Sequence, residues 1–240
     1  VTHHDGDWGV LTSQQDEERA RTHAVSDPAD HHASIAAREL HWFDSGANQW
    51  VSKGELGDWS GWHAVSAEGA ENADAWMPWS TALDDSAAPF FRWFVDGQTN
   101  ACFNLLDRHV LAGRGAQQSV VFEGDRWDPS KNEGRGGPVF EQRLSYRELL
   151  IEVAVRARVL KHLGLSAGDR IALNLPNIVE QIFYILAAQR LGVIYTPVFG
   201  GFSAKTLSDR IHDAGAKVVI TADGGYRNAE VVPYLSLIHI

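Results

Sequence analysis

The sequence has little cysteine, little positive charge and no long apolar run. Its single cysteine, Cys102, excludes an internal disulfide and a zinc site built from several cysteines, and it suits a reducing compartment. Lys and Arg number 21 against 31 Asp and Glu, so the formal net charge is −10, which argues against partners such as nucleic acid or an anionic membrane. No apolar run of about 18 residues occurs, and the first residues lack the pattern of a signal peptide. We therefore expect an acidic, cytoplasmic protein.

The amino-acid composition changes along the chain. Residues 1–40 are polar, so we expect them to be mostly disordered or weakly helical, with one helix near residues 33–40. Their paired histidines, His3–His4 and His31–His32, lack a third ligand at suitable spacing, so no metal site is predicted. Residues 41–117 are rich in Trp, Gly and Asp, which indicates an irregular extension. Six of its aromatic residues are too concentrated to stay in water: Trp76, Trp79, Phe90, Phe91, Trp93 and Phe94.

From residue 118 the pattern becomes regular. Residues 119–124 and 138–144 predict two strands joined by a charged, glycine-rich loop. Ser145 and Glu148 have the spacing of a capping box, which opens a helix that ends at Gly164. Strands over 170–175, 193–199 and 217–222 then alternate with two helices, one capped by Asn177 and the other by Ser203. This alternation predicts an α/β fold, with the irregular extension followed by part of a doubly wound parallel sheet over residues 118–234.

The two ends of the chain suggest a fragment. The chain begins at Val1 rather than methionine, and the predicted sheet is still growing where it stops. One back-translation of the last six residues, CTG TCT CTT ATA CAC ATC, reproduces a transposon end used as an adapter in sequencing libraries. We therefore expect residues 235–240 to be a non-native, adapter-derived tail.

Two glycine-rich turns are the candidate ligand sites. Phe199, Gly200 and Gly201 follow a predicted parallel strand and precede a helix, where backbone N–H groups favour anions. A tight turn without any ligand is the alternative. Arg227 follows the next predicted strand in a second glycine-rich turn, where its guanidinium suits a phosphate, and a solvated surface arginine is the alternative. If the two strands are neighbours, the two turns border one crevice.

Other candidates are weaker. The Lys205–Thr206 pair ends a segment that superficially resembles a P-loop, but Ala204 stands where that motif requires glycine. The run Asp107–Arg108–His109 has no nucleophile beside it, so we interpret it as an ion-paired structural cluster. Cys102 has no evident activator, so we expect a small buried residue.

Three stretches of the chain resemble AMP-forming acyl-CoA synthetases of the acetyl-CoA synthetase branch of the adenylate-forming superfamily. They are PFFRWFVDGQTNACFNLLDRHV at 89–110, GDRIALNLPN at 168–177 and VFGGFSAKTLSDRIHDAGAKVVITADGGYRNAEVVP at 198–233. Within this branch, EGDRWDPSKNEGRGGPV at 123–139 and GGYRNAEVVP at 224–233 are similar to the amino-terminal ligase module of propionyl-CoA synthases.

The resemblance implies a two-step ligation in which a small carboxylic acid, MgATP and CoA give acyl-CoA by way of an acyl-adenylate. It implies that Phe199, Gly200, Gly201 and Arg227 line the site for the nucleotide end of CoA. The family usually carries a second basic residue three positions after the arginine, whereas Glu230 stands here, and a carboxylate repels CoA phosphates.

The family's ATP-phosphate loop, magnesium motif and catalytic lysine do not occur in this sequence. The resemblance therefore implies no catalytic or metal-binding residue in the chain, no adenylation by the chain alone, and a missing carboxyl-terminal part as its partner. NADPH enters only if a reductase module is fused downstream. A synthetase specific for acetate or propionate is one alternative, and a non-catalytic α/β binding or docking module is another.

Overall fold

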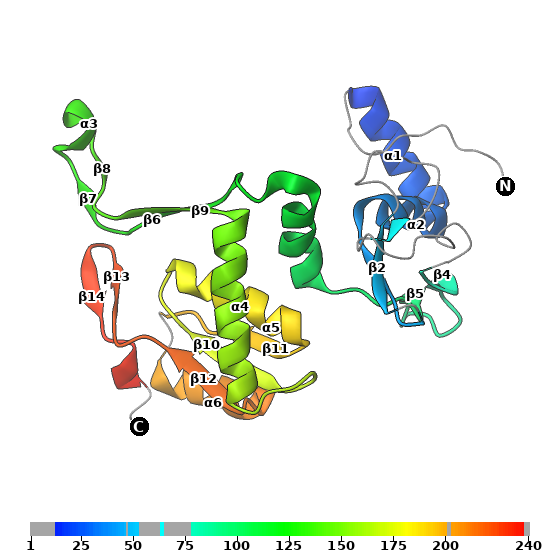
Figure 1. Cartoon of the computed structure of the whole chain (residues 1–240). Helices are drawn as coiled ribbons and strands as arrows, with labels where there is room; N and C mark the ends of the chain where they lie inside the picture. Colours follow the sequence, from blue (N-terminus) through cyan, green and yellow to red (C-terminus); the bar gives the residue numbers. More distant parts are fainter. Residues whose placement is uncertain (1–12, 47, 53–62, 65–77, 201–202, 238–240) are drawn as a thin grey trace. The chain divides into compact units, whose positions relative to one another are not determined.

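The computed structural model describes residues 13–46, 48–52, 63–64, 78–200 and 203–237. The chain forms two compact units, residues 1–100 and residues 101–240 (Figure 1). The sequence places a domain boundary at 117/118, whereas the compact units divide at 100/101. The division comes earlier because Cys102 and Leu106 are buried in the core of the second unit.

Two helices occupy the start of the first unit, where the sequence predicts disorder and a single helix. Helix α1 spans Gln14–Ser26 and helix α2 spans Pro28–Glu39, so the expected helix is present but longer, and α1 is additional. The Ser13 hydroxyl accepts from the Asp16 N–H at 3.1 Å, and the Asp27 carboxylate accepts from the Asp30 N–H at 3.0 Å. Helix α1 buries none of its residues, so its caps indicate it better than its weak apolar pattern does.

The rest of the first unit is more regular than predicted. Strands β1 (Trp42–Asp44), β2 (Gln49–Ser52) and β3 (His63–Ala64) form an antiparallel sheet, and β4 (Thr81–Asp84) pairs with β5 (Arg92–Val95). Trp42 is buried and donates from its indole N–H to the Ala36 carbonyl at 3.1 Å. Its ring lies 5.0 Å from that of Trp79 and 5.4 Å from that of Phe94. Aromatic anchors therefore hold this unit together, as the composition indicates.

Three of the six aromatic residues expected to be buried are not. Phe90 is 80% exposed and Phe91 is also exposed, because both lie on the loop of the β4–β5 hairpin. Trp93 of β5 is exposed as well, although its ring lies 5.0 Å from that of His32. Trp79 and Phe94 pack against the Trp42 cluster as expected. Trp76 lies outside the described residues, as do His3 and His4.

The second unit begins with two π-helical segments, Phe103–Asp107 and Val110–Arg114. Strand β6 (Gln118–Glu123) then pairs antiparallel with β9 (Glu141–Ser145), which confirms the predicted strand pair. The loop between them is itself a hairpin with β7 (Trp127–Asp128), a short turn α3 (Lys131–Gly134) and β8 (Gly137–Pro138). We call residues 118–145 the arm.

From residue 146 to residue 221 the helices and strands alternate as predicted, and a β-hairpin and a short turn that were not predicted follow them. They are α4 (Tyr146–His162), β10 (Arg170–Asn174), α5 (Val179–Leu191), β11 (Ile194–Pro197), α6 (Ala204–Ala214), β12 (Val218–Thr221), β13 (Gly225–Arg227), β14 (Glu230–Val232) and a 3₁₀ turn at Leu235–Leu237. The Ser145–Glu148 capping box is formed, and Ser203 caps α6. Asn177 does not cap α5: the N-cap position is Ile178, whose side chain makes no capping bond.

Strand β10 lies between β11 and β12 in a parallel sheet. The connection from β10 to β11 and the connection from β11 to β12 run in opposite directions across the sheet. Because such connections are right-handed, α5 and α6 cover opposite faces, and α4 packs against α5 (Figure 1). The α/β class and the parallel, doubly wound arrangement are confirmed.

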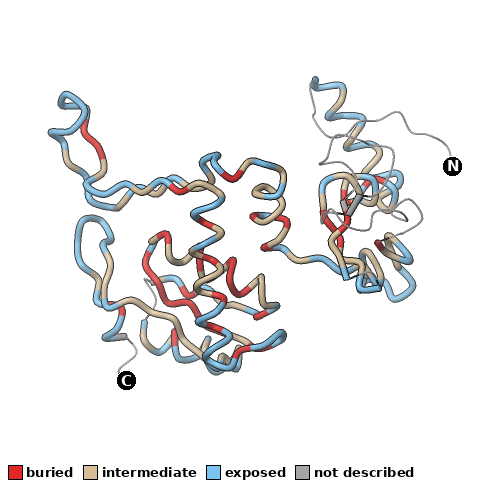
Figure 2. The backbone as a smooth tube through the Cα atoms, viewed as in Figure 1, coloured by how far each residue is buried: buried red, intermediate tan, exposed pale blue. Residues whose placement is uncertain are grey.

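The core of the second unit lies between β10 and the α4–α5 pair. Figure 2 shows buried residues along β10 and on the inner sides of both helices. Helix α4 buries its apolar positions at the helical spacing predicted: Leu149, Val153, Ala157 and Leu160. This packing fixes the carboxyl ends of the three parallel strands, where the loops of interest emerge.

Candidate functional site

A pocket of about 310 Å³ opens at the carboxyl end of the parallel sheet. Leu175 and Asn177 reach it from the segment after β10, and Phe199 and Gly200 reach it from the segment after β11. Helices α5 and α6, which follow these two adjacent strands, cover opposite faces of the sheet. The pocket therefore lies at a topological switch point, where open α/β sheets bind their ligands.

The second candidate turn meets the first at this pocket. The guanidinium carbon of Arg227 lies 5.0 Å from the centre of the Phe199 ring, in a cation–π arrangement. Both side chains are exposed, so the guanidinium also faces solvent. The crevice hypothesis required β11 and β12 to be neighbouring strands. They are not, because β10 lies between them. The β13–β14 hairpin nevertheless brings Arg227 to the same pocket as Phe199.

Gly200 and Gly225 are needed for close backbone approach. A Cβ atom at position 200 would lie 1.9 Å from the Tyr234 hydroxyl oxygen, and one at position 225 would lie 2.4 Å from the Pro176 Cβ. Tyr234 is buried and also lines the pocket. The glycines thus let the two loops and the Tyr234 segment converge. Gly201 lies outside the described residues.

The hairpin that carries Arg227 was missed by sequence reasoning. It turns on Asn228 and Ala229, whose φ angles are 53° and 63°, both in the left-handed region. Alanine seldom adopts this conformation, so the sequence carries no glycine signal for the turn. The Ala229 N–H donates to the Asp125 carboxylate of the arm at 2.7 Å, and this bond secures the turn. In the register of the hairpin, Glu230 is the direct partner of Arg227.

The P-loop-like segment forms an ordinary helix start. The Thr206 N–H donates to the Ser203 hydroxyl at 3.3 Å, and the Lys205 ammonium pairs with Asp209 one turn later at 2.7 Å. Lys205 is therefore engaged along the surface of α6.

The Asp107–Arg108–His109 run has a structural role, as predicted. Its ion pair, however, is formed with a residue of another element and not within the run. Asp107 pairs at 2.5 Å with Arg190 of α5. Burial, with smaller contributions from Arg114 and Arg108, lowers the pKa of His109 to about 4, and its ring lies 4.7 Å from that of Tyr146. Cys102 is fully buried as predicted, and burial raises the pKa of its thiol to about 11. These groups hold the π-helical segments in place.

A histidine cluster joins α1 and α2. His31 is buried rather than solvated, and its Nδ1 lies 3.3 Å from Nδ1 of His23. Burial, together with the nearby His32 and His23, lowers the pKa of His31. Within the described residues, no three His, Cys, Asp or Glu side chains form a group that could hold a metal ion. None of the described helices is long and apolar enough to cross a membrane.

Comparisons with known families agree with this geometry. Residues 129–237, which include the parallel sheet and the β13–β14 hairpin, match the AMP-binding enzyme family, and residues 67–105 match the acetyl-coenzyme A synthetase N-terminus. Each of the two matches covers less than half of the chain.

Several curated relatives carry the name acetyl-coenzyme A synthetase. The chain is 45% identical over 157 residues to that of Mycobacterium tuberculosis strain H37Rv, covering 65% of this chain and 22% of the relative. It is 44% identical over 162 residues to that of Wolinella succinogenes, covering 67% and 22%, and 34% identical over 224 residues to that of Rhodopirellula baltica, covering 93% and 27%. The chain thus spans about a quarter of the length of these relatives.

Proposed function

We propose that the chain is part of an AMP-forming acyl-CoA synthetase that works in the cytoplasm and that it carries part of the CoA site. In the whole enzyme, a carboxylate oxygen attacks the α-phosphorus of MgATP and releases pyrophosphate. The CoA thiolate then attacks the carbonyl carbon of the acyl-adenylate and releases AMP. The matched families and the names of the relatives support this reaction class.

The observation that carries the CoA assignment is the convergence of Phe199, Gly200 and Arg227 on one pocket at the switch point. The fixed charge and planar donors of a guanidinium suit a phosphate, and the Phe199 ring offers a face to a base. Glycine at position 200 lets Tyr234 pack directly against the backbone at this pocket. We assign this pocket, together with Gly201, to the nucleotide end of CoA.

We further propose that the acid is 3-hydroxypropionate and that the parent protein is a propionyl-CoA synthase. Of the two stretches that resemble this enzyme, residues 123–139 form the outer part of the arm and residues 224–233 contain the β13–β14 hairpin. The Asp125–Ala229 hydrogen bond joins them, so they are parts of one local structure. Dehydration and NADPH-dependent reduction of the CoA ester would belong to modules outside this chain.

An assay of the protein encoded by the extended reading frame tests the reaction and the acid together. We expect CoA- and ATP-dependent acyl-CoA formation, fastest with 3-hydroxypropionate when it is compared with acetate and propionate. A clear preference for acetate or propionate would overturn the 3-hydroxypropionate assignment. A reading frame without an ATP-phosphate loop or a catalytic lysine would overturn the reaction itself.

The purified 240-residue chain provides a second test. Because it contains no phosphate loop for ATP, we expect no acid-dependent exchange of pyrophosphate into ATP. Detectable exchange would show that the 240-residue chain does contain the residues needed for adenylation.

A further inference from the structure

A second pocket of about 390 Å³ lies beside the candidate CoA pocket, between the arm and the start of α5. The two pockets share Asn177 and Tyr226. The walls of the second pocket are mainly apolar and aromatic, and the rings of Phe122 and Phe140 lie 6.1 Å apart along the arm. A planar, partly apolar group fits such walls better than an ion does.

Arg126 lines this second pocket and stacks on the ring of Tyr226. The guanidinium carbon of Arg126 lies 5.3 Å from the centre of the Tyr226 ring. Arg126 is exposed, and no described carboxylate forms an ion pair with it. The arm backbone holds it in place, because the Val139 N–H donates to the Arg126 carbonyl at 2.7 Å. Stacking on Tyr226 therefore restrains a guanidinium that has no anionic partner in this part of the chain.

Two carboxylates, those of Asp125 and Glu180, also line the second pocket. Asp125 accepts the Ala229 N–H, which fixes the arm to the hairpin. Glu230 lies opposite Arg227 in the strand register of the hairpin. Tyr226, on which Arg126 stacks, lies opposite Val231. Arg126 is thus the positively charged side chain of the second pocket, beside the carboxylates of Asp125 and Glu180.

The result is two guanidiniums, each on an aromatic ring, at two adjoining pockets. CoA has a matching distribution of groups, because its adenosine carries a diphosphate at the 5′ position and a separate phosphate at the 3′ position. We infer that Arg126 binds the 3′-phosphate of CoA, with the adenine against the aromatic walls of the second pocket and the diphosphate at Arg227. This inference rests on the proposed function, because it assumes that CoA binds at the first pocket.

The inference makes Arg126 a specificity residue. Dephospho-CoA differs from CoA only in lacking the 3′-phosphate, so the two ligands separate binding at Arg126 from binding elsewhere. A charge-assisted hydrogen bond lost from the complex corresponds to a change in Kd of about tenfold or more. We therefore expect the chain to bind CoA about tenfold more tightly than dephospho-CoA.

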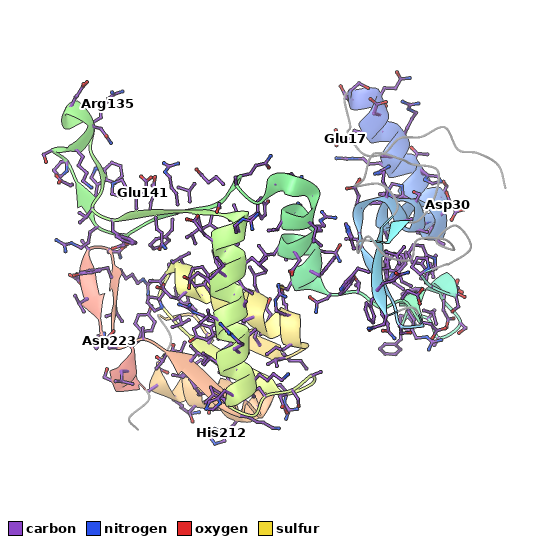
Figure 3. All side chains as sticks on the ribbon, in the orientation of Figure 1. Glu17, Asp30, Arg135, Glu141, His212 and Asp223 are labelled. Atoms are coloured by element: carbon purple, nitrogen blue, oxygen red, sulfur yellow. The ribbon has the colours of Figure 1, made fainter. Side chains whose placement is uncertain are left out.

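Titration calorimetry of the 240-residue chain with CoA and dephospho-CoA tests the inference. We expect Arg126→Gln to weaken CoA binding by about tenfold and to leave dephospho-CoA within about twofold, and Arg126→Lys to retain part of the preference. Arg227→Gln should weaken both ligands. The matched control is Arg135→Gln, at the tip of the same arm (Figure 3), which should change neither.

The outcomes distinguish the inference from the function on which it rests. If Arg126→Gln changes neither ligand, or weakens both equally while Arg227→Gln weakens both, the Arg126 inference is wrong and the CoA site stands. If the folded wild-type chain binds neither ligand, or if Arg227→Gln has no effect, the proposed CoA site fails and the inference fails with it. Thermal unfolding of each variant confirms that the exposed substitutions leave the fold intact.

Discussion

Substituting Gly200 with alanine tests the packing that shapes the candidate site. The new methyl group would lie 1.9 Å from the Tyr234 hydroxyl oxygen and 2.4 Å from two of its ring carbons, so the ring must move. The φ angle of Gly200 is not in the left-handed region, so this contact alone causes the strain. Tyr234 is only 5% exposed, and forcing such a group aside costs about 1–3 kcal/mol. We expect the free energy of unfolding to fall by that amount.

A double-mutant cycle measured by urea denaturation isolates the contact. Tyr234→Ala removes the atoms that the new methyl group would meet, so adding Gly200→Ala to it should cause little further loss. The two substitutions should therefore be non-additive by about 1–3 kcal/mol. Additive losses would show that position 200 does not contact Tyr234, and the described packing of these two residues at the pocket would be wrong.

Three further predictions concern groups outside the pocket. Ser145→Ala removes the cap of α4 and should lower the free energy of unfolding by about 1 kcal/mol, measured by denaturation, whereas an unchanged value would contradict the capping box. The Lys217 ammonium, with the Ser166 N–H and hydroxyl, lowers the pKa of Asp169 from 3.8 to about 2. This stabilisation is complete above about pH 4 and is lost as the pH falls toward 2, so Asp169→Asn should reduce the acid sensitivity of thermal unfolding. Cys102, with its thiol pKa near 11, should react with a thiol reagent only in denaturant, and rapid labelling of the native chain would place it at the surface.

The sheet and its helices were predictable because their signals are local. Ser145 and Ser203 mark helix starts through their own side chains, and the structure uses each one as expected. Asn177 misled the prediction because the chain turns one residue later, at Ile178. The helices over residues 14–39 were underestimated because caps rather than a strong apolar face define them.

The pocket could be predicted only in part. The glycines after β11 and the arginine after β12 are visible in the sequence, but the order β11–β10–β12 separates their strands. Their meeting depends on the β13–β14 hairpin, which turns on Asn228–Ala229 and is secured by Asp125 from about a hundred residues earlier. Arg126 lies in the stretch at 123–139 that resembles propionyl-CoA synthases, but nothing in that stretch marks it as a ligand-binding residue. Its position depends on this long-range pairing of arm and hairpin, which the sequence pattern does not encode locally.

The most direct test of the CoA assignment is a crystal structure of this chain with CoA bound. The account predicts that the coenzyme's nucleotide lies against Phe199 and Gly200, with a phosphate oxygen within hydrogen-bonding distance of the Arg227 guanidinium. A coenzyme bound away from both loops would contradict it.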